Sequence, residues 1–239
     1  MWNSTHALNR LAYALILTAV LLLLAALVWR VANFDMFAVK GIDVVGNVKH
    51  VTREQVETIT SNELKGTIFT VDLGGARAAF EKLPWVRRVD IRRRWPDRLE
   101  VAVQEHRALA RWGNTALVNR QGEVFEGASN QRLVVFDGPE GSASDITRNY
   151  LLFNELLAHI GHQVKSVRVS ERRAWSLRLD DGTAIELGRF AVDERLQRFV
   201  AVYARSVGTM DGTVDYIDLR YSNGFAVRVN NKKRSERRA

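Results

Sequence analysis

The chain begins with a long apolar segment that carries no charge. Residues 11–29 read "LAYALILTAVLLLLAALVW" and are bounded by Arg10 and Arg30. A helix over such a segment is about 28 Å long at ~1.5 Å per residue, close to the ~30 Å hydrocarbon core of a bilayer. Trp29 stands where an aromatic side chain favours the membrane interface. The pattern therefore predicts a transmembrane helix over residues 11–30.

Two other interpretations of this segment, a cleaved signal peptide and a buried helix, fit its sequence less well. A cleaved signal peptide normally has an apolar region of about 7–15 residues and a small-x-small site. This region is longer, and "LVWRVANF" offers no such site. A buried helix of a soluble protein would carry a polar face. We therefore expect an uncleaved anchor between a cytoplasmic tail (residues 1–10) and a linker (residues 31–38), although the nearly balanced flanking charges leave its orientation open.

The next part of the chain alternates between strand and helix patterns. "VKGIDVVGN" predicts a strand that ends in a Gly-Asn turn. Thr52 and Gln55 have the spacing of a capping box, so a helix is expected to begin there. Val56 and Ile59 would supply its buried stripe. "ARAAFEKL" predicts a second short helix, which Pro84 ends.

Two strands complete this domain. "WVRRVDIRRRW" and "LEVAVQEH" are joined by a turn at Pro96. Leu99, Val101 and Val103 alternate with polar or small residues, as in a strand with one buried face. The element order is therefore β-α-α-β-β, and we expect it to form one domain over residues 39–106.

The rest of the chain is richer in strands. Strand patterns and turn signals alternate over residues 116–139, 164–188 and 216–230. Two amphipathic helices interrupt them. The first is expected to begin with Asp145 as its N-cap and to end with Gly161 at the C′ position.

The second helix lies in "DERLQRFVAVYARSV". Its core face consists of the residues at i, i+3, i+4 and i+7, namely Leu196, Phe199, Val200 and Tyr203. The predicted fold class is α+β, with a single N-terminal transmembrane helix, the β-α-α-β-β domain, and a β-rich domain with two helices over residues 107–231. The basic residues 232–239 are predicted to be a disordered tail.

The final strands, "YIDLRYSNGFAVRVN", form a predicted hairpin whose register depends on its turn. A two-residue Asn-Gly turn would place the two apolar sets on opposite faces. A three-residue loop over residues 222–224, with Gly224 in a left-handed bulge, keeps them on one face. It sets Asp218 opposite Arg228 and leaves Arg220 on the polar face, ready for a carboxylate. The predicted apolar pairs are Tyr221–Phe225, Leu219–Val227 and Ile217–Val229.

The last predicted strand, residues 225–230, has only one sequence neighbour. Its far edge would carry unpaired N–H and C=O groups, and such edges are usually blunted or used. Either another strand or the tail covers this edge, or another protein supplies the missing neighbour. We favour the second alternative, in which the edge docks a partner strand by β-augmentation.

Composition narrows the classes of function. The chain has 239 residues, 46% of them apolar, which is enough for one large or two small domains besides a membrane segment. It contains no cysteine, so disulfides, thiolate zinc sites and cysteine nucleophiles are excluded. The formal net charge of +8 is compatible with nucleic acid, an anionic membrane or an acidic partner and does not decide among them.

Arginines crowd the predicted hairpin of the first domain. Interleaved with aromatic residues, they could line a nucleic-acid groove. However, Val89 and Ile91 alternate with charged positions, as in a strand with one solvated face. We therefore favour a solvated sheet face and expect no nucleic-acid partner. The residues concerned are Arg87, Arg88, Arg92, Arg93, Arg94 and Arg98.

No motif for catalysis or metal binding stands out, and we expect neither an enzyme nor a cofactor. His159 and His162 lie in "HIGH" and could hold a metal, but Gly161 is expected to end the helix there and to leave a solvated terminus. Asp180 and Asp181 precede a glycine, as in a hairpin turn, and are not expected to act as an acid–base pair.

Two strings of the first domain resemble a known module. "VVGNVKHVTREQV" and "LPWVRRVDIRRRWPDRLEVAVQEHRALARW" are similar to a POTRA domain of the type found in the FtsQ/DivIB family of bacterial cell division proteins. "LVNRQGEVF", "RRAWSLRLDDG", "LGRF" and "YIDLRYSNGFAV" resemble the second, β-rich domain of that family in the same order. The resemblance extends from the anchor to Asn230.

This resemblance implies a non-enzymatic scaffold of the divisome. The protein would be a bitopic inner-membrane protein, enriched at the septum, with a cytoplasmic N-terminus and two periplasmic domains. It would link early and late division proteins and control septal cell-wall synthesis, without a nucleic acid or a small-molecule substrate. The implied partners are FtsB and FtsL at the β-rich domain, and other division proteins such as FtsK, FtsW and FtsI. The alternative is a membrane-anchored envelope enzyme or a POTRA protein of the outer-membrane-assembly type.

The resemblance also implies a binding site. In the family, FtsB adds a strand to the last β-strand, close to arginines and a tyrosine. Val229 stands where some relatives have Trp, and Asn223 stands where relatives have Ser. The expected partner-binding residues are Arg172, Arg220, Tyr221, Asn223, Phe225, Val227 and Val229.

Overall fold

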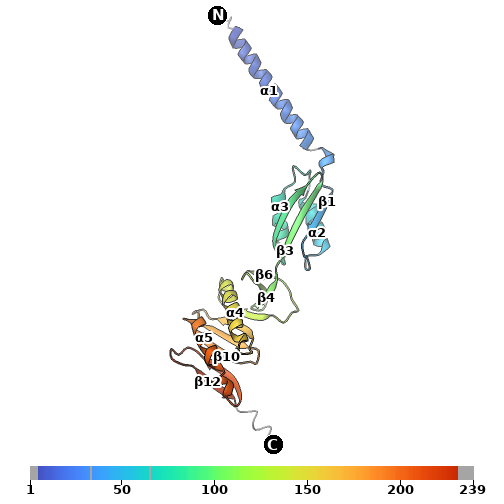
Figure 1. Cartoon of the computed structure of the whole chain (residues 1–239). Coiled ribbons are helices and arrows are strands. Elements are labelled where there is room, and N and C mark those ends of the chain that lie inside the picture. The colour runs from blue at the N-terminus through green and yellow to red at the C-terminus, as the bar shows by residue number, and fades with distance from the viewer. Residues whose placement is uncertain (1–4, 33, 65, 231–239) are drawn as a thin grey trace. The chain divides into compact units, whose positions relative to one another are not determined.

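The chain separates into two compact units, residues 1–105 and residues 106–239 (Figure 1). The predicted disordered tail, residues 232–239, lies outside the residues that the structure describes. The computed structural model describes residues 5–32, 34–64 and 66–230.

Helix α1 (Thr5–Ala32) contains the predicted apolar segment. Its stretch from Leu8 to Ala32 is 25 residues long with a mean hydropathy of 2.8, which is long and apolar enough to cross a membrane. Large side chains such as Leu22 and Trp29 are exposed, as suits a helix that is solvated by lipid. The predicted helix is confirmed, and it has the properties of a single membrane anchor.

The first unit has the predicted β-α-α-β-β order. After a short 3₁₀ helix, η1 (Asp35–Phe37), its elements are β1 (Gly41–Val45), α2 (Arg53–Glu63), α3 (Leu73–Glu81), β2 (Val86–Arg94) and β3 (Arg98–Glu105). Strand β3 lies in the centre of a three-stranded sheet, antiparallel to β2 and parallel to β1 (Figure 1). The element order and the β2–β3 hairpin are those that the sequence predicts, and the parallel pairing of β1 with β3 is a finding of the structure.

The core of this unit follows the alternation in the sequence. Leu99 and Val101 are fully buried, and Val103 is nearly so. On β2, Val89 faces the same core, and Phe80 of α3 fills it from the helical side. Burying these side chains removes apolar surface from water and fixes the register of the hairpin.

Helix α2 begins as predicted but is buried less than predicted. The Gln55 backbone N–H donates to Thr52 Oγ1 (3.3 Å), and the Thr52 N–H donates to Gln55 Oε1 (2.9 Å), which completes the capping box. Val56 and Ile59 pack against the core but are only half-buried, and α2 has no fully buried residue. The capping box therefore defines where α2 starts, while the helix itself is only partly buried against the core.

The connection between β1 and α2 is held by Glu105, the last residue of β3. Its carboxylate accepts hydrogen bonds from the backbone N–H groups of Lys49, His50 and Val51 at 2.8–3.0 Å. His50 Nδ1 lies 3.1 Å from the same carboxylate, and the imidazole stacks on Trp85 at 3.7 Å. Burial raises the pKa of Glu105, but the hydrogen bonds together lower it by a larger amount. The pKa of Glu105 therefore lies below its ordinary value.

The second unit is a nine-stranded sheet with two long helices among its described residues. The strands lie in the order β12-β11-β10-β9-β8-β7-β4-β5-β6. Its elements are β4 (Ala108–Trp112), β5 (Ala116–Asn119), β6 (Val124–Glu126), β7 (Val134–Asp137), α4 (Ala143–Ala158), β8 (Val164–Val169), β9 (Trp175–Leu179), β10 (Ala184–Gly188), α5 (Val192–Tyr203), η2 (Val207–Thr209), β11 (Thr213–Asp218) and β12 (Ala226–Asn230).

Both helices cover the same face of this sheet. Helix α4 packs against β8, α5 packs against β10, and the two helices contact each other. Phe153 and Leu157 of α4 and Leu196 and Phe199 of α5 are buried in the cluster that contains the inner face of the sheet. The predicted α+β class, with two helices in a β-rich unit, is confirmed.

The two ends of α4 differ in how well they were predicted. The helix begins after Ser142 and not after Asp145, because the Ser142 C=O already accepts from the Ile146 N–H (2.9 Å). Asp145 therefore lies in the first turn. At the other end, Gly161 has φ +80° and its N–H donates to the Ala158 C=O (3.1 Å), as expected of a glycine at C′.

The predicted register of the terminal hairpin is wrong by two residues. Ile217 lies opposite Val227, where the three-residue loop would put Val229. Asp218 lies opposite Ala226, where the prediction had Arg228. The connection between β11 and β12 runs over residues 219–225 and is longer than predicted.

Contacts with other parts of the sheet explain the longer connection. The Leu219 N–H donates to the Glu186 C=O (2.8 Å), which ties this residue to β10. The Asp218 carboxylate accepts from the Arg220 backbone N–H (3.0 Å). These bonds turn the chain out of the hairpin ladder after Asp218, while the Ile217–Val227 pair still keeps both apolar sets on one face.

Candidate strand-docking edge

Strand β12 lies at the end of the nine-stranded sheet. Within residues 106–230, β11 is its one strand neighbour. No other described strand covers its outer edge, as the sequence predicts, while the tail that could also cover it lies outside the described residues. An edge of this kind presents main-chain donors and acceptors to a further strand.

The direction of the main-chain groups in β11 follows from its bond to β10. In a strand, the N–H and C=O of one residue point to the same side, and those of the next residue point to the other. Because the Leu219 N–H donates to Glu186, the groups of Leu219 and Ile217 face β10. The groups of Asp218 and Tyr216 therefore face β12.

The same alternation identifies the outward groups of β12. Ala226 and Arg228 lie opposite Asp218 and Tyr216, so their main-chain groups pair with β11. The main-chain N–H and C=O groups of the intervening residues face the open edge. These residues are Phe225, Val227 and Val229.

The side chains of these three residues do not face the edge. The Phe225 ring contacts the Phe199 ring edge to face at 5.4 Å, and Val227 packs against the same core. Val229 is half-buried. What these positions can offer to a partner is therefore their backbone, while their side chains keep the strand in register.

From the sequence, Arg220 is expected to be available for a carboxylate of a partner. In the structure it is instead paired within the chain. Its Nε lies 2.9 Å from Asp218 Oδ1 and its Nη2 lies 2.6 Å from Asp218 Oδ2, a bidentate ion pair. The hydrogen bonds from Arg220 lower the pKa of Asp218, and the carboxylate raises the pKa of Arg220. Asp218 thus fixes the guanidinium at the end of β11, on the side of Gly188 in β10, so that it is already paired within the chain.

The loop beside the edge is exposed. Tyr221 is 58% exposed. Asn223 is also exposed, and the Arg198 Nη1 donates to the Ser222 C=O (2.7 Å), which holds the loop to α5. This loop presents an aromatic ring next to the open strand.

Arg172 comes to the same end of the sheet. It lies in the turn between β8 and β9, whose first pair is Val169–Trp175. Trp175 lies opposite Gly188, the last residue of β10. Since β10 runs parallel to β11, Arg172 and the Asp218–Arg220 pair occupy one end of the sheet.

The sequence analysis missed Phe190 at this end. It follows β10 and is 71% exposed, and the guanidinium of Arg189 lies 5.5 Å from its ring centroid. The sequence signal that could have identified Phe190 is an aromatic residue two positions after the strand pattern, in "LGRF". The basic and aromatic end of the sheet is thus larger than predicted.

Three arginines of the β2–β3 hairpin make side-chain contacts within the first unit. Arg93 Nε donates to the Ile68 C=O (2.5 Å), and Arg94 lies 2.6 Å from Glu100. Arg98 pairs with Asp43 at 3.2 Å. On β2, Val89 and Ile91 are buried while Arg92 is exposed, which fits the solvated sheet face that was favoured over a nucleic-acid groove.

The first unit has a groove beside its edge strand. It lies between β1 and α2, has a volume of about 730 Å³, and is lined by apolar residues that include Val44, Val48 and Val56. Its presence follows from the incomplete burial of α2. It gives the POTRA-type unit a second surface that a protein could contact.

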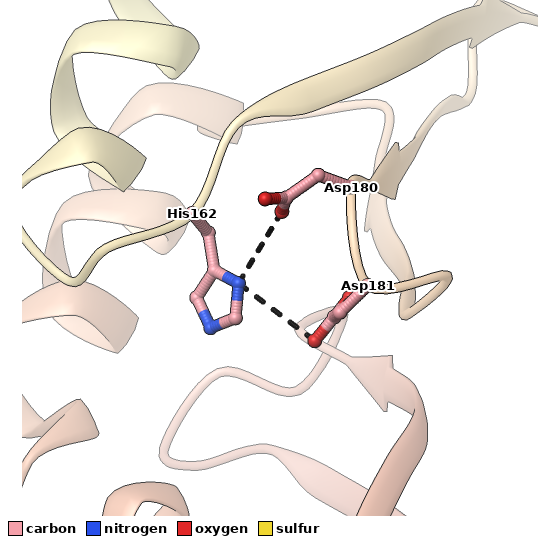
Figure 2. Close-up of side chains that lie close together, drawn as sticks. All are labelled: His162, Asp180 and Asp181. Atoms are coloured by element: carbon pink, nitrogen blue, oxygen red, sulfur yellow. Dashed lines mark ion pairs between the residues drawn. The ribbon is translucent and has the colours of Figure 1, made fainter.

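The prediction of a solvated "HIGH" terminus is correct for one of its two histidines. His159 is exposed, but the side chain of His162 is only 18% exposed and its Nε2 lies 2.8 Å from the Tyr203 hydroxyl. Its Nδ1 faces the carboxylates of Asp180 and Asp181 (Figure 2). The predicted β9–β10 turn is present and brings both carboxylates to this imidazole. The sequence could not predict that His162, the two aspartates and Tyr203 lie together, because Tyr203 belongs to helix α5, which is distant in the sequence.

One apolar anchor helix, a β-α-α-β-β unit and a β-rich unit with an open edge define a membrane-anchored POTRA-containing protein. Two family models match it: "POTRA domain, FtsQ-type" over residues 37–106 and "Cell division protein FtsQ/DivIB, C-terminal" over residues 110–220. The chain belongs to the FtsQ/DivIB family of cell division proteins.

Curated relatives agree over nearly the whole chain. Cell division protein FtsQ of Nitrosospira multiformis is 40% identical over 95% of this chain and 99% of its own length. The FtsQ proteins of Burkholderia pseudomallei and Neisseria gonorrhoeae are 39% and 34% identical, over 96% and 95% of this chain and 94% and 95% of their own lengths. These matches support a role in cell division. The C-terminal family model ends at Arg220, before the loop and β12.

Proposed function

We propose that this protein is a non-enzymatic scaffold of the divisome that docks a strand of FtsB at β12. It is anchored in the inner membrane by α1, with a cytoplasmic N-terminus and both folded units in the periplasm at the septum. Through these contacts it links early and late division proteins and controls septal cell-wall synthesis. The open edge of β12, in a chain of the FtsQ/DivIB family, is the observation that carries the proposal.

The basic end of the sheet supports an acidic partner segment. A strand added beside β12 would bond to the outward main-chain groups of Phe225, Val227 and Val229. Its flanking carboxylates would meet Arg172 and the guanidinium that Asp218 holds. FtsL would join through FtsB on the same unit, and the groove beside α2 gives FtsK, FtsW or FtsI a separate surface on the POTRA unit.

Arg172→Ala is expected to weaken binding of the periplasmic segment of FtsB about tenfold, because the contact is a charge-assisted one at the rim of the site. Tyr221→Ala is expected to weaken it roughly thirtyfold, since exposed tyrosines are frequent hot spots. Calorimetric titration of the full chain in detergent micelles measures both. Arg178→Ala is the matched control, because Arg178 lies on β9 at the other end of the sheet. Equal losses in Arg178→Ala and Arg172→Ala would reject the site.

The proposed orientation predicts where a C-terminal reporter works. Alkaline phosphatase fused to the C-terminus of the full chain is expected to be active, because this enzyme needs the oxidising periplasm. A fluorescent protein that matures only in the cytoplasm is the matched control and is expected to stay dark at the same position. The reverse pattern would put both units in the cytoplasm and would favour a DNA-binding anchor.

A further inference from the structure

Three side chains from two separate loops converge at one end of the second unit. His162 lies between α4 and β8, and Asp180 and Asp181 lie in the turn between β9 and β10 (Figure 2). His162 Nδ1 is 3.5 Å from Asp180 Oδ1 and 3.7 Å from Asp181 Oδ2. One nitrogen and two carboxylate oxygens thus point at a common space, with all three atoms within 4.8 Å of one another.

The other side of the imidazole is held by α5. His162 Nε2 lies 2.8 Å from the Tyr203 hydroxyl, and the two rings meet edge to face. When Nε2–H donates to this hydroxyl, the lone pair of Nδ1 points toward the two carboxylates. Histidines that bind metals are oriented in this way, by a hydrogen bond on the nitrogen that does not bind the metal.

Backbone N–H groups hold both carboxylates in place. The Gln163 N–H donates to Asp180 Oδ1 (3.2 Å), and the Thr183 N–H donates to Asp181 Oδ1 (2.8 Å). Asp181 Oδ2, which faces His162, is thereby directed away from the turn. The three groups are therefore positioned by the fold and not only by one another.

The spacing suits a bound cation better than a direct hydrogen bond. A strong hydrogen bond between nitrogen and oxygen is about 2.7–3.2 Å long, which is shorter than both observed distances. Two ligands on one tetrahedral Zn²⁺ ion are about 3.3–3.6 Å apart, since each lies about 2.0–2.2 Å from the metal. Ca²⁺ and Mg²⁺ prefer oxygen ligands throughout, so an imidazole among the ligands favours Zn²⁺ or a similar transition metal.

We propose that His162, Asp180 and Asp181 form a site for one divalent transition-metal ion of the Zn²⁺ class, with a water molecule as the fourth ligand. Such an ion would join the start of β8 to the β9–β10 turn and, through Tyr203, to α5. The site lies at the opposite end of the sheet from Arg172 and the Asp218–Arg220 pair. Its role would be structural, and it does not depend on the proposed docking of FtsB.

The other histidines whose side chains the structure describes are engaged elsewhere. His50 contacts Glu105 and stacks on Trp85. His106 stacks on Phe125 at 4.2 Å. His159 is exposed, and its Nδ1 lies 2.9 Å from the C=O of Glu155, in the preceding turn of the same helix. His159 is therefore a matched control for His162, three residues away.

The test is a titration of the full chain, without an affinity tag and in detergent micelles, with ZnCl₂ after treatment with a chelator. One equivalent is expected to bind saturably, and His162→Ala is expected to bind at least tenfold more weakly. His159→Ala is expected to match the unchanged protein. Tyr203→Phe is expected to weaken binding about tenfold, because it removes only the group that orients the imidazole.

Two further measurements guard against a variant that fails to fold. Asp180→Asn with Asp181→Asn keeps the shape of the turn and is expected to lose Zn²⁺ binding while retaining its circular dichroism spectrum. CoCl₂ is expected to give the intense visible absorption of a tetrahedral site in the unchanged protein and not in this double variant. The proposal is overturned if the unchanged protein binds no Zn²⁺ at millimolar concentration, or if both ligand variants bind as tightly as His159→Ala.

Discussion

Val227→Pro is expected to weaken docking of the FtsB segment by at least about thirtyfold while the second unit stays folded. The N–H of Val227 faces the open edge of β12 and has no part in the ladder with β11. Proline removes this donor and puts its ring where the partner strand would lie, and such a change is tolerated in edge strands when the lost N–H faces outward. We expect a loss of about 2 kcal/mol or more in binding free energy, roughly thirtyfold in affinity.

Two control variants separate the backbone from the side chain. Val227→Ala removes part of the apolar side chain but keeps the N–H, so it is expected to bind within about threefold of the unchanged protein. Arg228→Pro removes an N–H that pairs with β11, so it is expected to lower the thermal unfolding midpoint of the unit. Calorimetry and circular dichroism of the full chain measure these effects. Equal binding by Val227→Pro and Val227→Ala would show that this edge is not the docking site.

Glu105→Ala is expected to lower the unfolding free energy of the first unit by about 2–4 kcal/mol, since three backbone donors and one imidazole lose a common charged acceptor. Glu105→Gln keeps one acceptor oxygen and is expected to lose about half as much. Hydrogen exchange of the amides of Lys49, His50 and Val51 is the local measurement, and it should accelerate in both variants. Unchanged exchange would show that the connection is held by other contacts.

The same contact makes a prediction about pH. The pKa of Glu105 in the folded chain lies below its ordinary value of 4.5. A carboxylate of this kind adds stability above its unfolded pKa, and this contribution is lost as the pH falls through the folded pKa. The difference in unfolding free energy between the unchanged protein and Glu105→Gln is therefore expected to be constant near pH 7 and to shrink below about pH 4.5. A difference that grows on acidification would contradict this account. Glu100→Gln, on the same strand, serves as the control.

Local patterns in the sequence were enough to predict most of the elements. The capping box at Thr52, the glycine at position 161 and the alternation of Leu99, Val101 and Val103 each depend on neighbours a few residues away. Such interactions are visible in a sequence because periodicity and cap chemistry are local. The resemblance to the FtsQ/DivIB family then supplied the order of the units.

The features that were predicted wrongly depend on distant parts of the chain. The hairpin register was set by the bond from Leu219 to Glu186 on β10, which no pattern within the hairpin contains. The burial of His162 depends on Tyr203, which is 41 residues further along the sequence. In each case a tertiary contact outweighed a local preference.

The outward backbone of β12 has a consequence for how this protein and its partner evolve. The side chains of Phe225 and Val227 pack against their own core, and Val229 is half-buried. Under the proposed docking, mutations at these positions would therefore be selected for folding and not for recognition. Main-chain hydrogen bonds depend on the length and twist of the strand that is added and not on the identity of its side chains. If a partner strand docks as proposed, its sequence can change without loss of the main-chain bonds. Covariation between the two chains is then expected at Arg172 and Tyr221 and not along the ladder.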